Sequence, residues 1–255
     1  MKMICKITPS AKLKRFGKYA IEKKEFMGRE YIELRISKRI GKRAFCALIC
    51  RLKNEISLFL CPNKYREIIK QCGVEVFDEH RILSLLTLNF AVKMLNHNKS
   101  AAKSMSLCLV DKQLEYKSSI HRLVTLCRSV KIMGCERLDE FSTLCDDIFE
   151  KTGAEPSICR SNAKFDMIIL PKTHTLIINR QKYTVTKGCF DSGENNLLAL
   201  CMISVFGAVA MPDITPILQM NDKTVGLYDI PLKSEPKNCH EEIIFCCNEK
   251  NNMLK

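Results

Sequence analysis

The chain has 255 residues, 46% of them hydrophobic and 27% charged, which is the composition of a globular protein with room for one large core or two modest ones. Its net charge of +13 arises in residues 1–103, which hold 23 Lys and Arg against 9 Asp and Glu, whereas residues 104–255 hold 18 against 19. This length and composition exclude a small disulfide scaffold, and the uneven charge is a hint of an anionic partner.

Fifteen cysteines are spread along the chain, and we expect them to be reduced. Several lie in apolar runs, where a free thiol acts as a small hydrophobic group: Cys46, Cys50, Cys108, Cys127 and Cys201. The first residues contain no apolar stretch of signal-peptide length. The longest apolar run, Leu197–Met211, is shorter than the ~20 residues that span a bilayer. These features predict a cytoplasmic protein without a membrane segment.

The first part of the chain predicts a small basic α/β region. Residues 1–30 are basic and weakly patterned, and 44–52 is ambiguous between helix and strand. The other expected elements are strands at 31–37, 55–61 and 74–77, a helix at 64–72 that ends at Gly73, and a helix at 79–96 with Leu83, Leu86, Phe90 and Met94 on one stripe, widened by Ile82 and Leu85. The polar segment 97–103 suggests a domain boundary, giving domains 1–103 and 104–232 and an extension 233–255.

Residues 105–171 carry the clearest pattern, in which short β-rich runs alternate with amphipathic helices. The expected strands are 105–110, 130–133, 157–159 and 165–170, and the expected helices are 114–127 and 136–151, the second ending at Gly153. This alternation predicts a parallel sheet with right-handed crossovers. Beyond it we expect a hairpin of 175–179 and 182–186 around Arg180 and Gln181, a helix after the loop 188–193 with Asp191 or Ser192 as N-cap, and strands at 224–228 and 242–246.

In element order and length, residues 105–171 resemble the Rossmann-like half-unit of NAD(P)-binding proteins. The resemblance implies a ligand crevice at the carboxyl ends of the strands and a G-x-G-x-x-G loop after the first strand. Here that loop reads Val110-Asp-Lys-Gln-Leu-Glu115 and contains no glycine. We therefore predict an α/β protein with a degenerate Rossmann-like parallel sheet and a smaller basic N-terminal α/β region.

The candidate ligand-binding residues follow three predicted strands: Asp111, Lys112, Gly134, Glu136, Arg137, Arg160 and Ser161. Asp111 either caps the next helix or lies beside an anion that Lys112 helps to hold. The resemblance places Glu136 near a ribose hydroxyl or Arg137 near a 2′-phosphate, whereas the plainer alternative is a helix start. His174, just past the strand stop Pro171, is the histidine best placed for the crevice, although a turn or surface role also fits it.

A further candidate surface consists of Lys38, Arg39, Lys42 and Arg43. Its charge density suits phosphate contacts, but no aromatic side chains alternate with it, and a solvated face is the simpler interpretation. The Cys and His spacings match no zinc template, so no metal is expected.

Three functions stay open. The first is binding of a small ligand or a protein partner without a cofactor, and the absent glycine loop favours it. The second is an NAD(P)-dependent oxidoreductase with an atypical phosphate loop. The third is association with nucleic acid through the basic N-terminal region.

Overall fold

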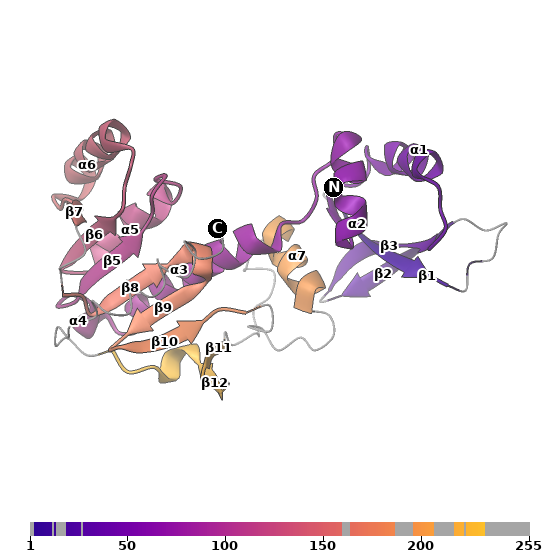
Figure 1. The fold of residues 1–255 in the computed structure, drawn as a ribbon. Helices are drawn as coiled ribbons and strands as arrows, with labels where there is room; N and C mark the ends of the chain where they lie inside the picture. Colours follow the sequence, from indigo (N-terminus) through magenta and orange to yellow (C-terminus); the bar gives the residue numbers. More distant parts are fainter. Residues whose placement is uncertain are drawn as a thin grey trace, which may run out of the picture. The chain divides into compact units, whose positions relative to one another are not determined.

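The computed structural model describes residues 3–11, 13, 19–26, 28–159, 164–186, 196–206, 217–221 and 223–232. They form two compact units, which interleave along the chain (Figure 1). Unit 1 runs to Glu79 and also contains the helix α7 (Asn196–Phe206), and unit 2 begins at His80. The sequence suggested a boundary at 97–103, whereas the first compact unit ends at residue 79. The long helix α3 (Glu79–His97) therefore belongs, from His80 onward, to unit 2 and not to the N-terminal region.

Unit 1 is a four-stranded sheet with helices, in which the strands lie in the order β2-β3-β1-β4. β1 is parallel to β3 and β4, and only β2 runs antiparallel to its neighbour β3. The elements besides α7 are β1 (Ile4–Ser10), β2 (Tyr19–Phe26), β3 (Arg29–Ser37), α1 (Lys42–Leu52), β4 (Leu58–Leu60) and α2 (Asn63–Gln71). The expected basic N-terminal α/β region is therefore confirmed.

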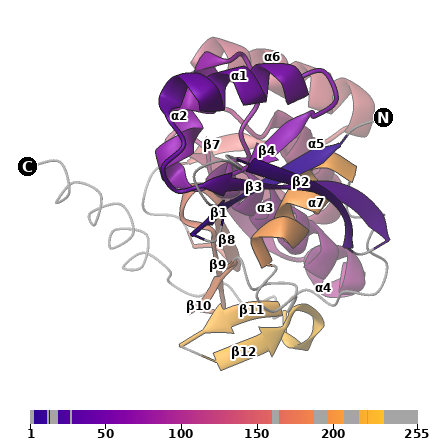
Figure 2. The same cartoon turned by 90° about the vertical axis from the view of Figure 1, so that its right-hand side faces the viewer.

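The core of unit 1 lies between one face of this sheet and the helices α1 and α2. Cys5 and Ile7 on β1 are paired in register with Ile32 and Leu34 on β3, so all four side chains share a face. They pack with buried residues of the helices, among them Phe45, Ile49, Tyr65 and Ile69. Figures 1 and 2 both show α1 and α2 side by side. α7 packs against β1 and β4.

Unit 2 is built on an eight-stranded sheet in the order β12-β11-β10-β9-β8-β5-β6-β7. The four strands at one end of this order, β8, β5, β6 and β7, are parallel to one another. Each of the strands β9 to β12 runs antiparallel to its neighbours. The bounds are β5 (Ser106–Val110), β6 (Ser129–Met133), β7 (Ser157–Cys159), β8 (Met167–Leu170), β9 (Thr175–Ile178), β10 (Gln181–Thr184), β11 (Ile217–Met220) and β12 (Lys223–Gly226). The order of the parallel strands is that of the first four strands of a Rossmann sheet.

Helices pack on this sheet through their apolar stripes. α5 (Lys117–Leu126) packs against β6 and α6 (Leu138–Thr152), and the predicted parallel sheet with two packed helices is confirmed. α3 (Glu79–His97) buries ten side chains around much of its circumference, although Leu85, which we expected in the apolar arc, is 39% exposed. α4 (Lys99–Ala102) and the 3-10 turns Pro171–Thr173 and Leu227–Asp229 complete the unit.

Several element bounds differ from the prediction. The segment 74–77, expected as a strand, makes only a single bridge, between Val76 and Phe59, and the weakly patterned residues 1–30, for which no element was predicted, contain β1 and β2. The turn between β9 and β10 is Asn179-Arg180, one residue earlier than expected, because both residues have positive φ (51° and 65°) as a tight hairpin requires. The loop at 188–193, the caps Asp191 and Ser192 and the strand at 242–246 lie outside the described residues.

Candidate functional site: the carboxyl edge of the parallel strands

The strand order of unit 2 marks one place on the sheet where a ligand site is expected. From β5 the chain continues to β6 on one side, whereas β8 lies on the other side of β5. In open α/β sheets, ligands bind at such a switch point, beyond the carboxyl ends of the strands. The loops that flank this point are 111–116 after β5 and 171–174 after β8. We call the residues of these two loops and their side-chain partners the switch-point edge.

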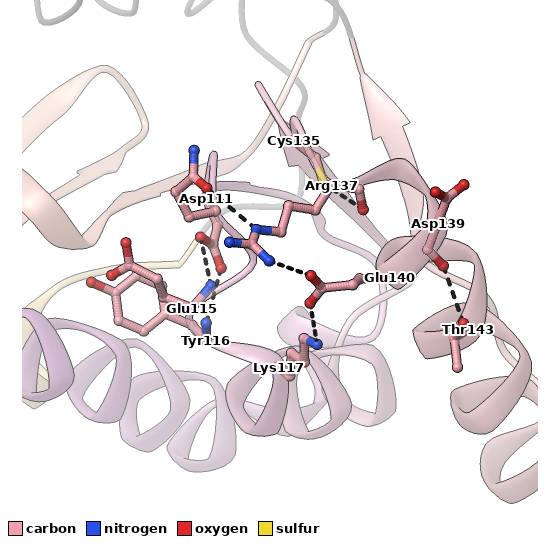
Figure 3. A network of polar contacts seen from close by, with 10 residues as sticks. Asp111, Glu115, Tyr116, Lys117, Cys135, Arg137, Asp139, Glu140 and Thr143 are labelled. Atoms are coloured by element: carbon pink, nitrogen blue, oxygen red, sulfur yellow. Dashed lines mark hydrogen bonds and ion pairs between the residues drawn. The ribbon is translucent and has the colours of Figure 1, made fainter.

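Asp111 organises the first loop from within. Its side chain is buried, and Oδ1 and Oδ2 accept hydrogen bonds of 3.0 Å from the backbone N–H groups of Glu115 and Tyr116 (Figure 3). The backbone N–H of Asp111 donates to the carbonyl of Met133 on β6 at 3.3 Å. Because the two loop amides bind the protein's own carboxylate, neither is available to a ligand phosphate. Both amides precede the first turn of α5, whose N-cap residue Tyr116 has no side-chain cap hydrogen bond, so Asp111 holds the loop and does not cap the helix, as the first of its two alternatives had it.

Lys112 and Gly134 lie against each other across the ends of β5 and β6. Gly134 has φ of 73°, and a β-carbon added there would lie 3.5 Å from Cγ of Lys112. The backbone N–H of Glu136 donates to the carbonyl of Lys112 at 2.9 Å. The space that this glycine leaves therefore borders on the Lys112 side chain. Lys112 is exposed and makes no ion pair with a described residue.

A polar network joins Glu136 and Arg137 to the loop after β5. Gln113 donates from Nε2 to Glu136 Oε2 at 2.7 Å, and Arg137 Nε donates to Gln113 Oε1 at 3.3 Å. Glu140 accepts from both Arg137 and Lys117, the latter at 2.7 Å (Figure 3). Hydrogen bonds from Lys117 and Arg137 hold the pKa of Glu140 below its usual range. Arg137 thus already has two side-chain partners within the protein.

The loop after β8 brings two histidines together. His174, in the left-handed conformation with φ of 55°, places Nε2 3.0 Å from Nδ1 of His80 in the first turn of α3. The rings are nearly perpendicular, with their centroids 4.5 Å apart. Ser84 Oγ lies 3.4 Å from the same Nδ1. A contact between two ring nitrogens requires one to donate and the other to accept.

The two loops are also joined directly. Lys172 Nζ lies 2.7 Å from Glu115 Oε1, and this hydrogen bond raises the pKa of Lys172. Burial raises the pKa of Tyr116, which outweighs the effect of its hydrogen bond with Ser84. Tyr116 therefore stays a neutral donor at physiological pH. The edge as a whole has balanced charge, with four cations and four anions: Lys112, Lys117, Arg137 and Lys172, and Asp111, Glu115, Glu136 and Glu140.

The structure thus brings five of the seven predicted crevice residues to one edge: Asp111, Lys112, Gly134, Glu136 and Arg137. Arg160 and Ser161 lie outside the described residues. His80 was missed, because a histidine at a helix start 94 residues from its partner gives no local signal. Lys38, Arg39, Lys42 and Arg43 belong to unit 1, where all four are exposed, the first two on the turn after β3 and the last two in the first turn of α1.

The described residues contain neither a metal-binding cluster nor a helix fit to cross a membrane. No group of three or more His, Cys, Asp and Glu side chains there could hold a metal ion. Within the same residues, no helix combines the length and hydropathy that crossing a bilayer requires.

Comparison with known proteins gives little further information. No family model and no curated protein matches the sequence. Among solved structures, L-tryptophan dehydrogenase from Nostoc punctiforme is similar with a TM-score of 0.28 and 11% identity, over 66% of this chain and 55% of that one. The chain therefore spans little more than half the length of that dehydrogenase. A similarity of this size carries no argument about activity.

Proposed function

We propose that the protein binds a small polar ligand at the switch-point edge and does so without a dinucleotide. The observation that carries the proposal is that the Asp111 carboxylate accepts hydrogen bonds from the two backbone N–H groups that directly precede α5. A pyrophosphate is held by free backbone N–H donors or by excess positive charge. At this edge the N–H groups of Glu115 and Tyr116 already bind Asp111, and the positive and negative side chains balance.

The ligand that suits this edge is small and carries one anionic or hydrogen-bonding group. Lys112 is a cation without an ion-pair partner among the described residues, and the second loop carries His174, whose ring contacts that of His80. Lys112 and His174 stand on the two loops that flank the switch point, and His80 stands on α3 beside His174. A mononucleotide, inorganic phosphate or a short carboxylate fits such a set better than a molecule with two phosphates and two rings.

A thermal-shift screen followed by calorimetry tests this proposal. The probes are inorganic phosphate, AMP, succinate, NAD and NADP, and the variants are Lys112→Met and His174→Asn, since asparagine tolerates the left-handed conformation. Lys93→Met on the exposed side of α3 is the control. We expect at least one of the first three probes to bind, with affinity reduced in both edge variants and unchanged in the control. Binding by none of them would contradict the small-ligand proposal and favour a protein partner.

A second candidate is nucleic acid binding by unit 1. The observation that favours it is that Lys38, Arg39, Lys42 and Arg43 are all exposed and none pairs with an acidic side chain among the described residues. The first turn of α1 also contains no acidic residue. No stacking aromatic accompanies these cations, so we rank this function below the first.

A further inference from the structure

Three cysteines of unit 1 come together where α1 meets the end of α2. Cys46 and Cys50 lie one helical turn apart on α1, and Cys72 is the C-cap residue of α2. The Sγ atoms of Cys46 and Cys72 are 3.5 Å apart, and Cys50 lies close enough to Cys72 to contribute to its raised pKa. The sequence shows the pair on α1 but gives no sign of the third thiol, which is 26 residues from Cys46. We call these three residues the thiol cluster.

The thiol cluster is accessible from solvent, unlike Cys108 and Cys201, which are buried as expected. Cys50 is exposed, and Cys46 and Cys72 are half-buried. The expectation that Cys46 and Cys50 serve as core hydrophobic groups is therefore wrong for Cys50. Cys108 and Cys159 also contact each other in unit 2, but both are buried. The chain thus contains one reachable thiol cluster and one enclosed thiol pair among its described residues.

The helices hold the two sulfurs near bonding distance. Phe45, next to Cys46, packs on Tyr65 of α2 with ring centroids 5.0 Å apart, which fixes α1 beside α2. A disulfide has an S–S length of about 2.05 Å, so the two sulfurs need to approach by about 1.5 Å, which is within the range of side-chain rotation.

We propose that Cys46, Cys50 and Cys72 form a reversible disulfide centre that reacts with a small disulfide such as glutathione disulfide. The exposed Cys50 thiolate attacks one sulfur of glutathione disulfide, forms a mixed disulfide and releases one glutathione thiol. Cys72 then loses its proton to water, attacks Sγ of Cys50 and displaces the second glutathione. Finally Cys46 attacks Sγ of Cys72 and releases Cys50 as a thiol. In sum, two protein thiols are oxidised to the Cys46–Cys72 disulfide, and one glutathione disulfide is reduced to two glutathione thiols.

The charge of the surrounding surface suits this reactant. All charged residues of α1 are cationic, namely Lys42, Arg43 and Arg51. Glutathione disulfide carries net negative charge at neutral pH, so this helix attracts it. Burial and the two neighbouring thiols raise the pKa of Cys72 to about 12. The step in which Cys72 attacks is therefore slow at neutral pH and faster as the pH rises. None of this depends on the ligand proposed for unit 2.

The test uses the full-length reduced protein in glutathione redox buffer, with thiols trapped by acid and alkylation and the peptides identified by mass spectrometry. We expect a disulfide that links Cys72 to Cys46, with some Cys72–Cys50, and its complete loss after dithiothreitol. In Cys72→Ser, glutathione should stay attached at Cys50. Cys61→Ser, a half-buried cysteine of the same unit outside the cluster, should behave as wild type.

Two results would overturn the proposal. One is an oxidised protein in which the first bond joins Cys108 to Cys159 or leaves Cys72 reduced. The other is a Cys72→Ser protein that carries no glutathione at Cys50. If Cys72→Ser proves unfolded by circular dichroism, Cys46→Ser takes its place: its oxidation should stop at the Cys50–Cys72 bond, and a Cys46→Ser protein that does not form this bond would overturn the proposal.

Discussion

Asp111 accepts a hydrogen bond of 3.0 Å from the backbone N–H of Tyr116, five residues further along the chain. In a glycine-rich loop the corresponding amides face outward and bind phosphate. Here the loop turns inward on its own carboxylate. The sheet order of a nucleotide-binding protein is thus combined with a loop whose donors are partly used within the fold.

The first prediction is that neither NAD nor NADP binds more tightly than about 1 mM, equivalent to roughly −4 kcal/mol. Two loop amides are occupied, and Lys112 and Gln113 carry side chains where glycine would admit a pyrophosphate. Isothermal titration calorimetry measures this directly. Micromolar binding that is lost in Arg137→Ala or Glu136→Ala would instead support the oxidoreductase.

The second prediction concerns the stability of the Asp111 loop. Asp111→Ala should lower the free energy of unfolding by about 3 kcal/mol, because it leaves two backbone donors without their acceptor. Asp111→Asn retains one acceptor oxygen and should cost about half as much. Urea unfolding followed by circular dichroism gives these values. Asp139→Ala on the exposed first turn of α6 is the control, with an expected loss below about 1 kcal/mol.

The third prediction is a pH-dependent contribution from Glu33 in unit 1. Burial alone would raise its pKa, but hydrogen bonds from Lys24, at 2.5 Å, and from Thr8, at 3.0 Å, outweigh it and lower the pKa below the ordinary 4.5. A lowered pKa stabilises the fold above pH 4.5, and this contribution is lost as the pH falls further. Urea titrations between pH 3 and 7 should therefore show wild type more stable than Glu33→Gln near neutrality, with the difference shrinking in acid.

The control for Glu33 is Glu30→Gln, an exposed position on the same strand without an ion pair among the described residues. Its stability should follow wild type over the same pH range. A constant difference between Glu33→Gln and wild type down to the lowest pH would contradict the assigned role.

The fourth prediction concerns the exposed cations before and within α1. We expect little or no RNA or DNA binding at physiological salt, since charge is present without stacking residues. Fluorescence anisotropy over a salt series tests this. Sub-micromolar binding that weakens steeply with salt, and is abolished when Lys38, Arg39, Lys42 and Arg43 are replaced together, would make nucleic acid the leading partner.

The fold of unit 2 was predictable because its elements carry periodic apolar residues. The stripes of α5 and α6 and the short runs of β5, β6 and β8 each match one period, and Gly153 ends α6 in the left-handed conformation, as expected. β2 was missed because most of its residues are exposed and several are glutamate or lysine, so its sequence lacks the alternation of apolar and polar residues that indicates a strand. The start of α5 was placed three residues early, since the positive φ of Leu114 (54°) is not a property that leucine suggests.

The site was predictable only where it follows strand ends. Asp111, Gly134 and Arg137 were found because parallel strands bring their carboxyl ends to one edge. The contact of His80 with His174 depends instead on how α3 lies on the sheet, and that of Cys46 with Cys72 on how α1 lies on α2. Such contacts are set by packing between distant segments, and one sequence contains no periodicity that reports them.

Unit 1 is made of two separate stretches of the chain, and this has a consequence for its folding during synthesis on the ribosome. α7 packs against β1 and β4 and contributes the buried side chains of Leu198, Leu200 and Cys201. At translation rates of ~5–20 residues per second, α7 emerges on the order of ten seconds after α2. During that interval the nascent first sheet lacks one of its covering helices while most of unit 2 is already being made. The emerging chain therefore has an apolar surface that a chaperone can recognise, and a fragment ending before residue 196 would keep this surface permanently.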